Sequence, residues 1–426
     1  MKTTWQKDLR LPEHPELTES LSTEVIIIGG GITGITLSYL LVKSGKKVIV
    51  IDKDTLGRSV SAKTTAFLAT DIDTDLPDLV KMFGKSETKE IWESHKSAID
   101  TTERIIKEEK LDCEFVRVPE FLFATTHEGW DKLEEEKVLA RRFGFNTEDL
   151  QNNALPFKNF GGYILPNQAK FHPLKYLGGL REKAEKLGVK FYENTEALSV
   201  TEGEKIKVVT EKGSIKADYA VIATYLPIRN PWQIFARKGI YYSYIYELEI
   251  PKGALPEGLY LDDKNPYHYF RVDKALEFDR MIIGGEDHRK ELPMNSQKNF
   301  EALEDYVQKI FPKLKYRIIT KWRGPILETI DGLPYIGMPD KNHPNMFVAT
   351  GFSGNGMTYA MIAAKIIAGQ ILGRKDKYEK LYSPYRNQFT ATGLWIKTCD
   401  YLGEFAGGYI KNVFRKVKSD VMSFDE

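Results

Sequence analysis

The sequence predicts an α/β protein (α+β overall): a Rossmann-like nucleotide-binding domain with an inserted antiparallel-sheet substrate domain. Three observations support this fold class. A glycine-rich turn, Gly29–Gly34, joins a short β run to a helix near the N-terminus. Helix–strand alternation returns in two later parts of the chain. Between those parts, residues 236–322 are rich in tyrosine and alternate in polarity, which is typical of antiparallel strands.

The bulk composition is that of a folded globular protein and excludes several functions. The chain has 426 residues, of which 42% are hydrophobic and 28% charged, and its formal net charge is +1. Without a strong net charge, no global field attracts nucleic acid. Cys113 and Cys399 are the only cysteines. We therefore expect neither a disulfide framework nor an internal iron–sulfur or zinc site, and no metal is predicted.

The sequence carries no recognisable targeting signal. Residues 1–20 are polar, contain no apolar signal core and are interpreted as an arm. No window approaches the roughly 20 apolar residues that a transmembrane helix needs. Together with the low cysteine count, these features predict a cytoplasmic protein.

The first elements form a βαβ unit. A short strand, Glu24–Ile28, leads into the glycine turn. An apolar helix follows the turn and is closed by Gly45. A second buried strand, Val48–Ile51, ends at Asp52. This order of elements is the one in which a nucleotide-binding turn functions.

Residues from about 76 to 160 do not continue the alternation of strands, glycine-rich turns and helices. Charged helical stretches are expected at Asp100–Lys110 and Trp130–Arg142, with a β-like segment at Phe115–Thr125. A helix over Pro173–Leu187 and a strand over Val189–Glu193 then restore the helix–strand alternation.

Further nucleotide-binding elements are expected later in the chain. Turn signals at 201–204 and 212–213 mark an exposed hairpin that leads into the strand Tyr219–Ala223. Near the C-terminus, the strand Met346–Ala349 precedes a second glycine-rich turn, and a helix runs from that turn to Leu372.

These elements predict an interleaved domain organisation. The expected nucleotide-binding domain comprises residues 20–80, 160–235 and 323–375, the substrate domain 81–159 and 236–322, and a helical tail 376–426. In the tail, apolar residues recur at helical spacing beside lysines and an arginine. Such a basic amphipathic helix docks on its own protein or a partner, or makes peripheral contact with an anionic membrane, and the sequence leaves these alternatives open.

The first glycine turn has the spacing of a phosphate-binding motif. Gly29 permits a tight turn, Gly31 lets the backbone approach a pyrophosphate, and Gly34 lets the helix pack on the strand. The helix N-terminus, at Ile32 and Thr33, offers free N–H groups to the phosphate. The turn therefore predicts dinucleotide binding.

The end of the second strand supplies the expected ribose contact. Asp52 stands where an acidic side chain accepts hydrogen bonds from the adenosine ribose, and Lys53 follows it. No arginine occupies this position to bind a 2′-phosphate. The turn and Asp52 together do not separate NAD from FAD.

Four separated motifs resemble the FAD-dependent oxidoreductases of the D-amino-acid-oxidase (DAO) family, which includes sarcosine and glycine oxidases. The motifs follow the family's order and exclude a simple NAD dehydrogenase. They are the serine- and threonine-rich segment 57–66, the strand 217–224, the signature 322–337 and the turn 349–357.

The resemblance implies non-covalent FAD. Relatives with covalent flavin attach it through a histidine or cysteine. This chain has Lys63 in the segment 57–66, which lies along the flavin in the family, and no cysteine near 331–344. Beyond the glycine turn and Asp52, the implied cofactor contacts are Ser59, Ser61, Lys63, Thr64, Thr65, Ala66, Ala197, Ala223, Thr224, Asp331, Gly354, Asn355, Gly356, Met357 and Thr358.

Two features would stabilise the reduced flavin. The turn Gly354–Gly356 begins a helix, and a helix N-terminus stabilises the negative charge that reduction places on the ring. Lys63 is a cation in the same region and would stabilise that charge or bind a substrate carboxylate. The alternative for Lys63 is an ordinary solvated lysine.

The strand around Tyr267–Arg271 is the expected substrate side. Tyr267, Tyr269 and Arg271 alternate and so share one face of a strand. Two aromatics and a guanidinium suit an amine or an amino acid, and in related oxidases a tyrosine–arginine pair binds the carboxylate. The alternative is a half-buried strand with an exposed arginine. His268 on the other face and His172 at a helix start are expected to be structural.

The implied reaction is oxidation of an amine or amino-acid-like substrate to an imine by hydride transfer to flavin N5. No side chain stands out as an acid or base, which agrees with hydride transfer from a neutral amine. The sequence also resembles a bacterial subgroup that often carries a C-terminal Rieske domain, whose paired Cys-x-His motifs are lacking here. We therefore expect oxygen, a quinone or a separate redox protein as electron acceptor. The alternative is a flavin-binding electron-transfer or assembly partner of a Rieske-like protein, without its own turnover.

Overall fold

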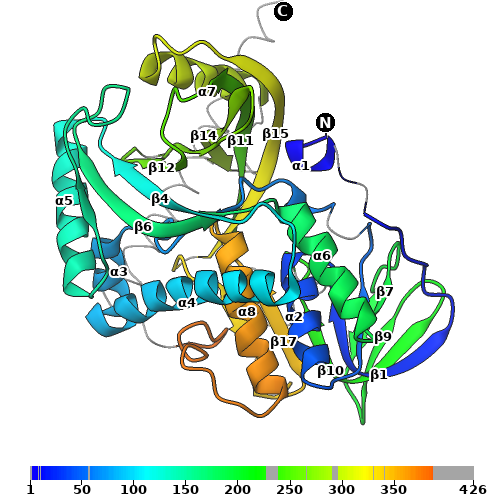
Figure 1. The fold of residues 1–426 in the computed structure, drawn as a ribbon. Helices are drawn as coiled ribbons and strands as arrows, with labels where there is room; N and C mark the ends of the chain where they lie inside the picture. Colours follow the sequence, from blue (N-terminus) through cyan, green and yellow to red (C-terminus); the bar gives the residue numbers. More distant parts are fainter. Residues whose placement is uncertain are drawn as a thin grey trace, which may run out of the picture.

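The computed structural model describes residues 2–386 except 8, 10, 56–57, 227–237, 265, 290–295, 330 and 340. Within these residues the chain forms two large sheets (Figure 1). The predicted tail helix, at 402–414, lies outside the described residues. No helix in the described part of the chain is long and apolar enough to cross a bilayer.

The first sheet has eight strands in the order β16-β17-β10-β1-β2-β7, with β9 and β8 continuing from β10. Its central strands β17, β10, β1, β2 and β7 run parallel to one another. The strands are β1 (Ser20–Ile28), β2 (Val48–Ile51), β7 (Lys190–Tyr192), β8 (Ser199–Thr201), β9 (Ile206–Val209), β10 (Ser214–Ile222), β16 (Tyr335–Gly337) and β17 (Met346–Thr350). Parallel strands end at one edge, so the loops after β1, β2, β10 and β17 meet there.

Both faces of this sheet are buried, which explains the continuous apolar runs in its strands. Val25 and Ile27 of β1 pack into the core under the helices. Ile26 and Ile28 point to the opposite core, which the hairpin strands β8 and β9 help to close. The alternation of the strand thus divides one apolar run between two cores.

Helices cover one face of the first sheet (Figure 1). The helix α2 (Ile32–Lys43) packs between α6 (Pro173–Lys186) and α8 (Gly356–Ile371), and α4 (Lys85–Glu109) packs across α8. Most residues of α8 are buried, because neighbouring elements surround it. The expected charged helix at Asp100–Lys110 is the C-terminal part of this longer α4.

The second sheet has nine strands in the order β15-β11-β14-β13-β12-β4-β6-β3, with β5 beside β6. All its pairs are antiparallel except β12 with β4. The strands are β3 (Phe67–Leu68), β4 (Val116–Phe123), β5 (Glu148–Leu150), β6 (Gly162–Lys170), β11 (Lys238–Pro251), β12 (Gly258–Asp262), β13 (Tyr269–Asp273), β14 (Phe278–Arg289) and β15 (Arg317–Thr329).

Helix α7 (Ser296–Ile310) covers one face of this sheet through an aromatic and aliphatic core. The opposite face of this sheet contacts the segment 63–66, which follows β2: Trp322 of β15 and Arg271 of β13 donate to its carbonyls. The remaining helices are α1 (Thr4–Lys7), the 3₁₀ turn η1 (Val60–Ala62), α3 (Leu76–Phe83) and α5 (His127–Arg142).

The structure confirms the expected mixed fold, with one sheet of largely parallel strands and one of largely antiparallel strands. The sheets do not follow the expected chain ranges at every point. Strand β6 and the C-terminal half of β15 belong to the second sheet, although their residues were assigned to the nucleotide domain. Conversely, α4, assigned to the inserted domain, packs on α8.

The N-terminal arm contains a buried anchor that its polar composition did not indicate. In the structure, residues 4–7 form α1, and the indole of Trp5 is 0% exposed. A single large aromatic side chain thus anchors an otherwise polar segment, since burying one indole removes a large apolar area from water.

The close contact between α2 and β1 gives a test of the fold. A Cβ at Gly34 would lie 1.9 Å from the Gly29 carbonyl oxygen, so Gly34→Ala must push the helix away from the strand. We expect a loss of roughly 2–4 kcal/mol in the free energy of unfolding. Urea unfolding followed by circular dichroism measures it.

Gly203→Ala is the matched control, because the Cβ it adds would meet nothing closer than 3.8 Å. Its unfolding midpoint is expected to equal that of the unmodified protein. Equal midpoints for both variants would contradict the close packing at Gly34.

Candidate functional site

The loops at the ends of the parallel strands form a glycine-lined cradle. Gly29 has φ +111°, and a Cβ there would lie 2.4 Å from the Ala223 carbonyl oxygen. The two strand ends are tied together, because the Ala223 N–H donates to the Ile28 carbonyl over 2.8 Å. A side chain at Gly31 would meet Ser61 Oγ at 3.2 Å. Glycine is therefore required where this turn packs closely against the end of β10 and against Ser61.

Asp52 lies beside this cradle as predicted. Its Oδ2 accepts from the Gly30 N–H over 2.7 Å, and its Oδ1 accepts from the Asp54 N–H over 2.9 Å. Burial raises the pKa of Asp52, which these two N–H groups partly offset. Each carboxylate oxygen keeps a second lone pair, so the group can accept from ribose hydroxyls. Lys53 next to it is exposed.

The start of α2 is joined to the segment after β2. The Ile32 N–H donates to Ser61 Oγ over 3.1 Å, and both residues are buried. Thr33 is buried in the first turn of the helix. Ser59 precedes η1 as its N-cap residue. The segment 58–66 is thus fixed against the glycine turn at Ser61.

The start of α8 forms the second part of the site. Asn355 is the N-cap residue, and its side chain accepts from the Asp73 N–H and donates to the Asp71 carbonyl. The Gly354 N–H donates to the Asp73 carboxylate over 2.6 Å. A Cβ at Gly356 would have no atom within 4 Å, so open space lies against the backbone there. A flat ring has access to this helix end.

The next two residues of α8 are buried. Met357 packs in the helix core, and Thr358 is 1% exposed. Within the described residues, Thr358 Oγ1 has no hydrogen-bond partner. An orphaned hydroxyl at a helix start is an additional donor for a ligand at this end.

The segment 63–66 presents four consecutive carbonyls to other elements. Trp322 Nε1 donates to the Lys63 carbonyl over 3.0 Å, and Trp5 Nε1 donates to the Thr64 carbonyl over 2.7 Å. Arg271 Nη1 donates to the carbonyls of Thr65 (3.0 Å) and Ala66 (3.2 Å). The backbone is therefore held firmly, while the Lys63 side chain is exposed.

The residues of this site fit the parts of an FAD molecule. The glycine cradle and Asp52 match the needs of a pyrophosphate and a ribose, and the open space at Gly356 admits a ring next to a helix N-terminus. The family described as DAO, FAD dependent oxidoreductase, matches residues 24–370. The chain belongs to this family.

Individual relatives agree with that assignment. The chain is 29% identical to the putative Rieske 2Fe-2S iron-sulfur protein YhfW of Bacillus subtilis (strain 168), over 90% of this chain and 75% of that protein. It is 22% identical to the gamma-glutamylputrescine oxidoreductase of Escherichia coli (strain K12), over 85% of this chain and 87% of that protein. Its fold matches the glycine oxidase of Geobacillus kaustophilus with a TM-score of 0.72, 18% identity and coverage of 86% and 99%.

These findings confirm the predicted family, the FAD cofactor and the class of FAD-dependent oxidoreductase. The relative named as a Rieske protein agrees with the predicted resemblance to the Rieske-containing subgroup. The positions of the individual cofactor contacts stay predictions, which the geometry of each residue supports to a different degree.

Among the other predicted cofactor contacts, three lie near strand ends. Ala223 and Thr224 follow β10 beside the glycine turn, where Thr224 Oγ1 donates to the Leu226 carbonyl. Ala197, after β7, is 4% exposed and packs in the core on the other face of the sheet.

The carboxylate of Asp331, a predicted cofactor contact, binds another side chain of the protein. Its carboxylate is paired with Arg386, whose Nε and Nη2 donate to it over 2.8 and 2.7 Å. The same guanidinium donates to the carbonyls of Leu333 and Pro334. The pair fixes the turn after β15, so Asp331 supports the site through backbone shape. No local sequence pattern indicated Arg386 as the partner, because it lies 55 residues along the chain from Asp331.

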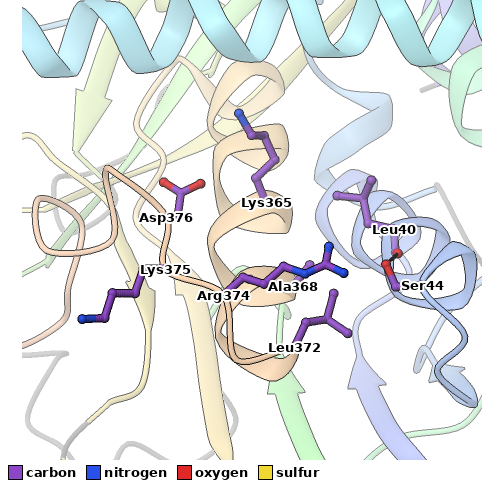
Figure 2. Close-up of a pocket in the computed structure, with 9 residues that line it drawn as sticks. Leu40, Ser44, Lys365, Ala368, Leu372, Arg374, Lys375 and Asp376 are labelled. Atoms are coloured by element: carbon purple, nitrogen blue, oxygen red, sulfur yellow. Dashed lines mark hydrogen bonds between the residues drawn. The ribbon is translucent and has the colours of Figure 1, made fainter.

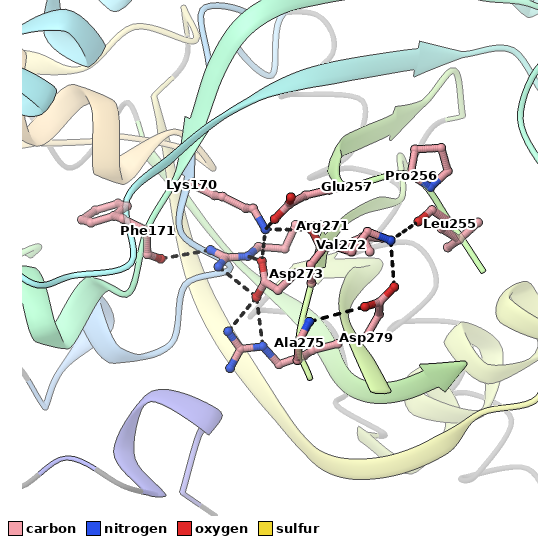
Figure 3. A network of polar contacts seen from close by, with 12 residues as sticks. Lys170, Phe171, Leu255, Pro256, Glu257, Arg271, Val272, Asp273, Ala275 and Asp279 are labelled. Carbon is pink, nitrogen blue, oxygen red and sulfur yellow. Dashed lines mark hydrogen bonds and ion pairs between the residues drawn. The ribbon is translucent and has the colours of Figure 1, made fainter. Parts of the chain in front are cut away.

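Arg271 also differs from expectation. It is 2% exposed, its Nε and Nη2 donate to Asp273, and its Nη1 donates to the Phe171 carbonyl (Figure 3). The same Nη1 also donates to the carbonyls of residues 65 and 66. Arg280 and Lys170 reach the same Asp273. Although burial raises its pKa, these cations hold the pKa of Asp273 well below its ordinary value. The geometry gives Arg271 a role other than the predicted contact with a substrate carboxylate.

The two tyrosines do lie together on the face turned towards the segment 63–66. The rings of Tyr267 and Tyr269 are 5.8 Å apart, and Tyr269 Oη lies 2.9 Å from Ser243 Oγ. A Cβ at Gly354 would be 3.1 Å from Tyr267 Oη, so that hydroxyl reaches the start of α8. His268 faces the other way, between Asp262 and Glu286 and stacked on Tyr306, as a structural residue.

Asp287 on β14 is a titratable group that sequence reasoning missed. Burial raises its pKa to about 6, and the Ser243 hydroxyl opposes that shift. Its Oδ1 has no partner within the described residues. The signal available in the sequence was the charged run Glu286–Arg289 at the end of an apolar strand, which is unusual in a buried sheet.

A second group of buried carboxyls includes one from the loop after β3. Asp71, Glu120 and Glu136 are buried around the hydroxyl of Tyr163. Burial raises the pKa of Asp71 to about 6 and, with repulsion from Asp75, that of Glu136 to about 8. Burial and Asp71 raise the pKa of Glu120 well above its ordinary value. These carboxyls share protons at neutral pH because their charges repel one another.

The hollow in Figure 2 is separate from this site. Its volume is about 260 Å³, and it lies between the C-terminal ends of α2 and α8, lined by Leu40, Ser44, Lys365, Leu372 and Arg374 among others. Helix α2 begins at the glycine cradle, α8 begins at the second part of the site, and both end at the hollow. It therefore lies a helix length away from the residues that suit FAD.

The raised pKa of Glu136 predicts how the stability of the protein depends on pH. Between the ordinary carboxyl pKa of 4.5 and about 8, the folded protein keeps a proton that the unfolded chain releases. Raising the pH through this window therefore lowers stability. Glu136→Gln is neutral at all pH values, so we expect it to raise the melting temperature of the FAD-loaded protein at pH 8.5 by roughly 2 °C or more.

Glu128→Gln on the same helix serves as control, because its carboxylate is 83% exposed. Differential scanning calorimetry at pH 5.5, 7 and 8.5 is expected to show a pH-dependent gain for Glu136→Gln alone. A pH-independent difference between the two variants would contradict a protonated Glu136.

Proposed function

We propose that the protein oxidises the carbon–nitrogen bond of an amine or amino-acid-like substrate to an imine and passes the electrons to oxygen, a quinone or a separate redox protein. The observation that carries this proposal is a buried, unpartnered carboxyl oxygen of Asp287, whose carboxyl group interacts with Ser243 and with the Asp73 carboxylate at the start of α8. The substrate would lie between this carboxyl group and the flavin.

The substrate-side face is built to hold a protonated amine. Asp287, Tyr267 and Tyr269 lie on neighbouring strands or the loop before them, and the Asp73 carboxylate stands at the start of α8. Electrostatic repulsion between the two carboxylates contributes to the raised pKa of Asp287. A cation placed between them would relieve that repulsion, and aromatic faces add cation–π attraction.

The amine must lose a proton before its carbon can release a hydride. Bound FAD would supply the acceptor for that hydride, at N5. A carboxylate with a pKa near 6 is ionised at neutral pH and can take the proton from the ammonium group, directly or through water. The proton then resides on Asp287 Oδ1, and the Ser243 hydroxyl holds the carboxyl in place.

Recognition of a substrate carboxylate would need a different arginine from the one expected. Arg271 is held by Asp273 and backbone carbonyls, so its guanidinium is already occupied. An amine without a carboxylate would not need such an arginine.

The names of relatives support an amine-bearing substrate. One relative is a gamma-glutamylputrescine oxidoreductase and a structural neighbour is a glycine oxidase. The substrates in these names differ in size and charge but each carries an amine. We also retain the proposal that Lys63, exposed on its rigid segment, stabilises the reduced flavin.

An anaerobic absorption titration tests this function. The FAD-loaded protein is mixed with diamines, monoamines and amino acids, and then exposed to air. Bleaching of the flavin by a compound of one class supports the proposal and identifies that class, and recovery in air identifies oxygen as acceptor. A flavin that no amine bleaches but a redox protein reduces would contradict it and support the electron-transfer alternative.

Asp287→Asn tests the proton acceptor. If the carboxylate must be ionised, kcat/KM of the unmodified enzyme rises with pH through about 6, since a raised pKa leaves the group protonated below that value. We expect Asp287→Asn to remove this limb and to lower kcat/KM by roughly 100-fold. Steady-state kinetics from pH 5 to 9 measure both.

Glu277→Gln is the control, because Glu277 is exposed in the turn just before β14. It is expected to leave the pH profile unchanged. An Asp287→Asn enzyme with the same limb near pH 6 would show that another group takes the proton.

A further inference from the structure

The N-terminal segment reaches the interior of the molecule next to the flavin segment. Helix α1 lies between β15 and α6 (Figure 1). It is tied to β11, because Thr4 Oγ1 donates to Glu247 over 2.9 Å and Lys7 pairs with the same carboxylate at 3.7 Å. Trp5 between them points inward and is 0% exposed.

The indole of Trp5 is enclosed by cations. The guanidinium carbons of Arg271 and Arg280 lie 5.1 and 5.3 Å from its ring centre, and the His172 ring meets it edge-on at 5.0 Å. Both guanidiniums are held in place by hydrogen bonds to Asp273. The ring is therefore held by several contacts at once, and its single N–H donor has a fixed direction.

That donor points at the Thr64 carbonyl over 2.7 Å. A trans peptide group is planar, so its N–H points away from its C=O. The Thr65 N–H therefore points away from Trp5. By the same reasoning, the bond from Trp322 to the Lys63 carbonyl turns the Thr64 N–H away from the sheet. Within the described residues, neither N–H has an acceptor.

We propose that Trp5 is a positioning residue for the flavin: by holding the Thr64 carbonyl, it aims the Thr65 N–H at the ring of the bound cofactor. The proposal rests on the placement of the flavin along residues 59–66. An N–H directed at the ring stabilises the negative charge of the reduced form more than the oxidised form. Trp5 thus acts through the peptide group and does not touch the reacting atoms.

Trp5→Phe removes the donor and keeps an aromatic ring among the guanidiniums. We expect FAD to bind the apo protein about fivefold more weakly, the effect of one lost hydrogen bond. The two-electron reduction potential of the bound flavin is expected to fall, because the reduced form loses stabilisation. Fluorescence titration with FAD and dye-coupled potentiometry measure these quantities.

Trp92→Phe is the matched control. Trp92 on α4 is 1% exposed, and its Nε1 has no hydrogen-bond partner within the described residues. The control therefore makes the same change of ring in a core without removing a hydrogen bond. Binding is measured at a temperature where circular dichroism shows all apo proteins to be folded, so that lost stability is not taken for lost affinity.

Weaker FAD binding and a lower potential in Trp5→Phe alone would support the proposal. Equal FAD affinity and potential in the two variants would overturn it. Failure of the unmodified apo protein to bind FAD would instead contradict the proposed function, so the two failures are distinguishable.

Discussion

The contact between the Gly34 position and the Gly29 carbonyl is the constraint on which the rest of the site depends. Only a glycine lets α2 approach β1 so closely, because a Cβ would lie 1.9 Å from that oxygen. The close approach brings the N-terminus of α2 to the edge where the parallel strands end. Asp52 and Ala223 meet the turn at the same edge. The second sheet meets the start of α8 through Tyr267 in the loop before β13, and the hydroxyl of Tyr267 would lie 3.1 Å from a Cβ at Gly354.

The local part of this architecture was predictable from the sequence. The spacing of the glycines, the acidic residue after β2 and the apolar runs of the parallel strands are each set by neighbouring residues. The βαβ unit and a strand at 346–349 were therefore expected, and β17 covers that strand. His172 was expected at a helix start, where its Nδ1 accepts from the Lys175 N–H. The order of separated motifs carried the resemblance to the family, which the family match confirms.

The remaining features depend on contacts between residues far apart in the chain. Arg271 has the spacing of a face-sharing strand residue, but only the fold brings Asp273, Arg280 and the carbonyls of residues 65 and 66 around it. Arg386 meets Asp331 across 55 residues. The raised pKa of Asp287 is a result of burial, which no local pattern encodes. Because of such contacts, Arg271 and Asp331 have structural partners, and Asp287 becomes the candidate for a functional role.

Hydrogen–deuterium exchange of the apo and FAD-loaded protein tests the central claim most directly, because it locates the cofactor on the chain. The account predicts that FAD slows amide exchange in three separated segments: the glycine turn at 29–34, the flavin segment at 59–66 and the start of α8 at 354–358. The hollow at the C-terminal ends of α2 and α8 is expected to be unaffected. Protection at that hollow, with unchanged exchange in the segment 59–66, would contradict the placement of the flavin and the proposals that depend on it.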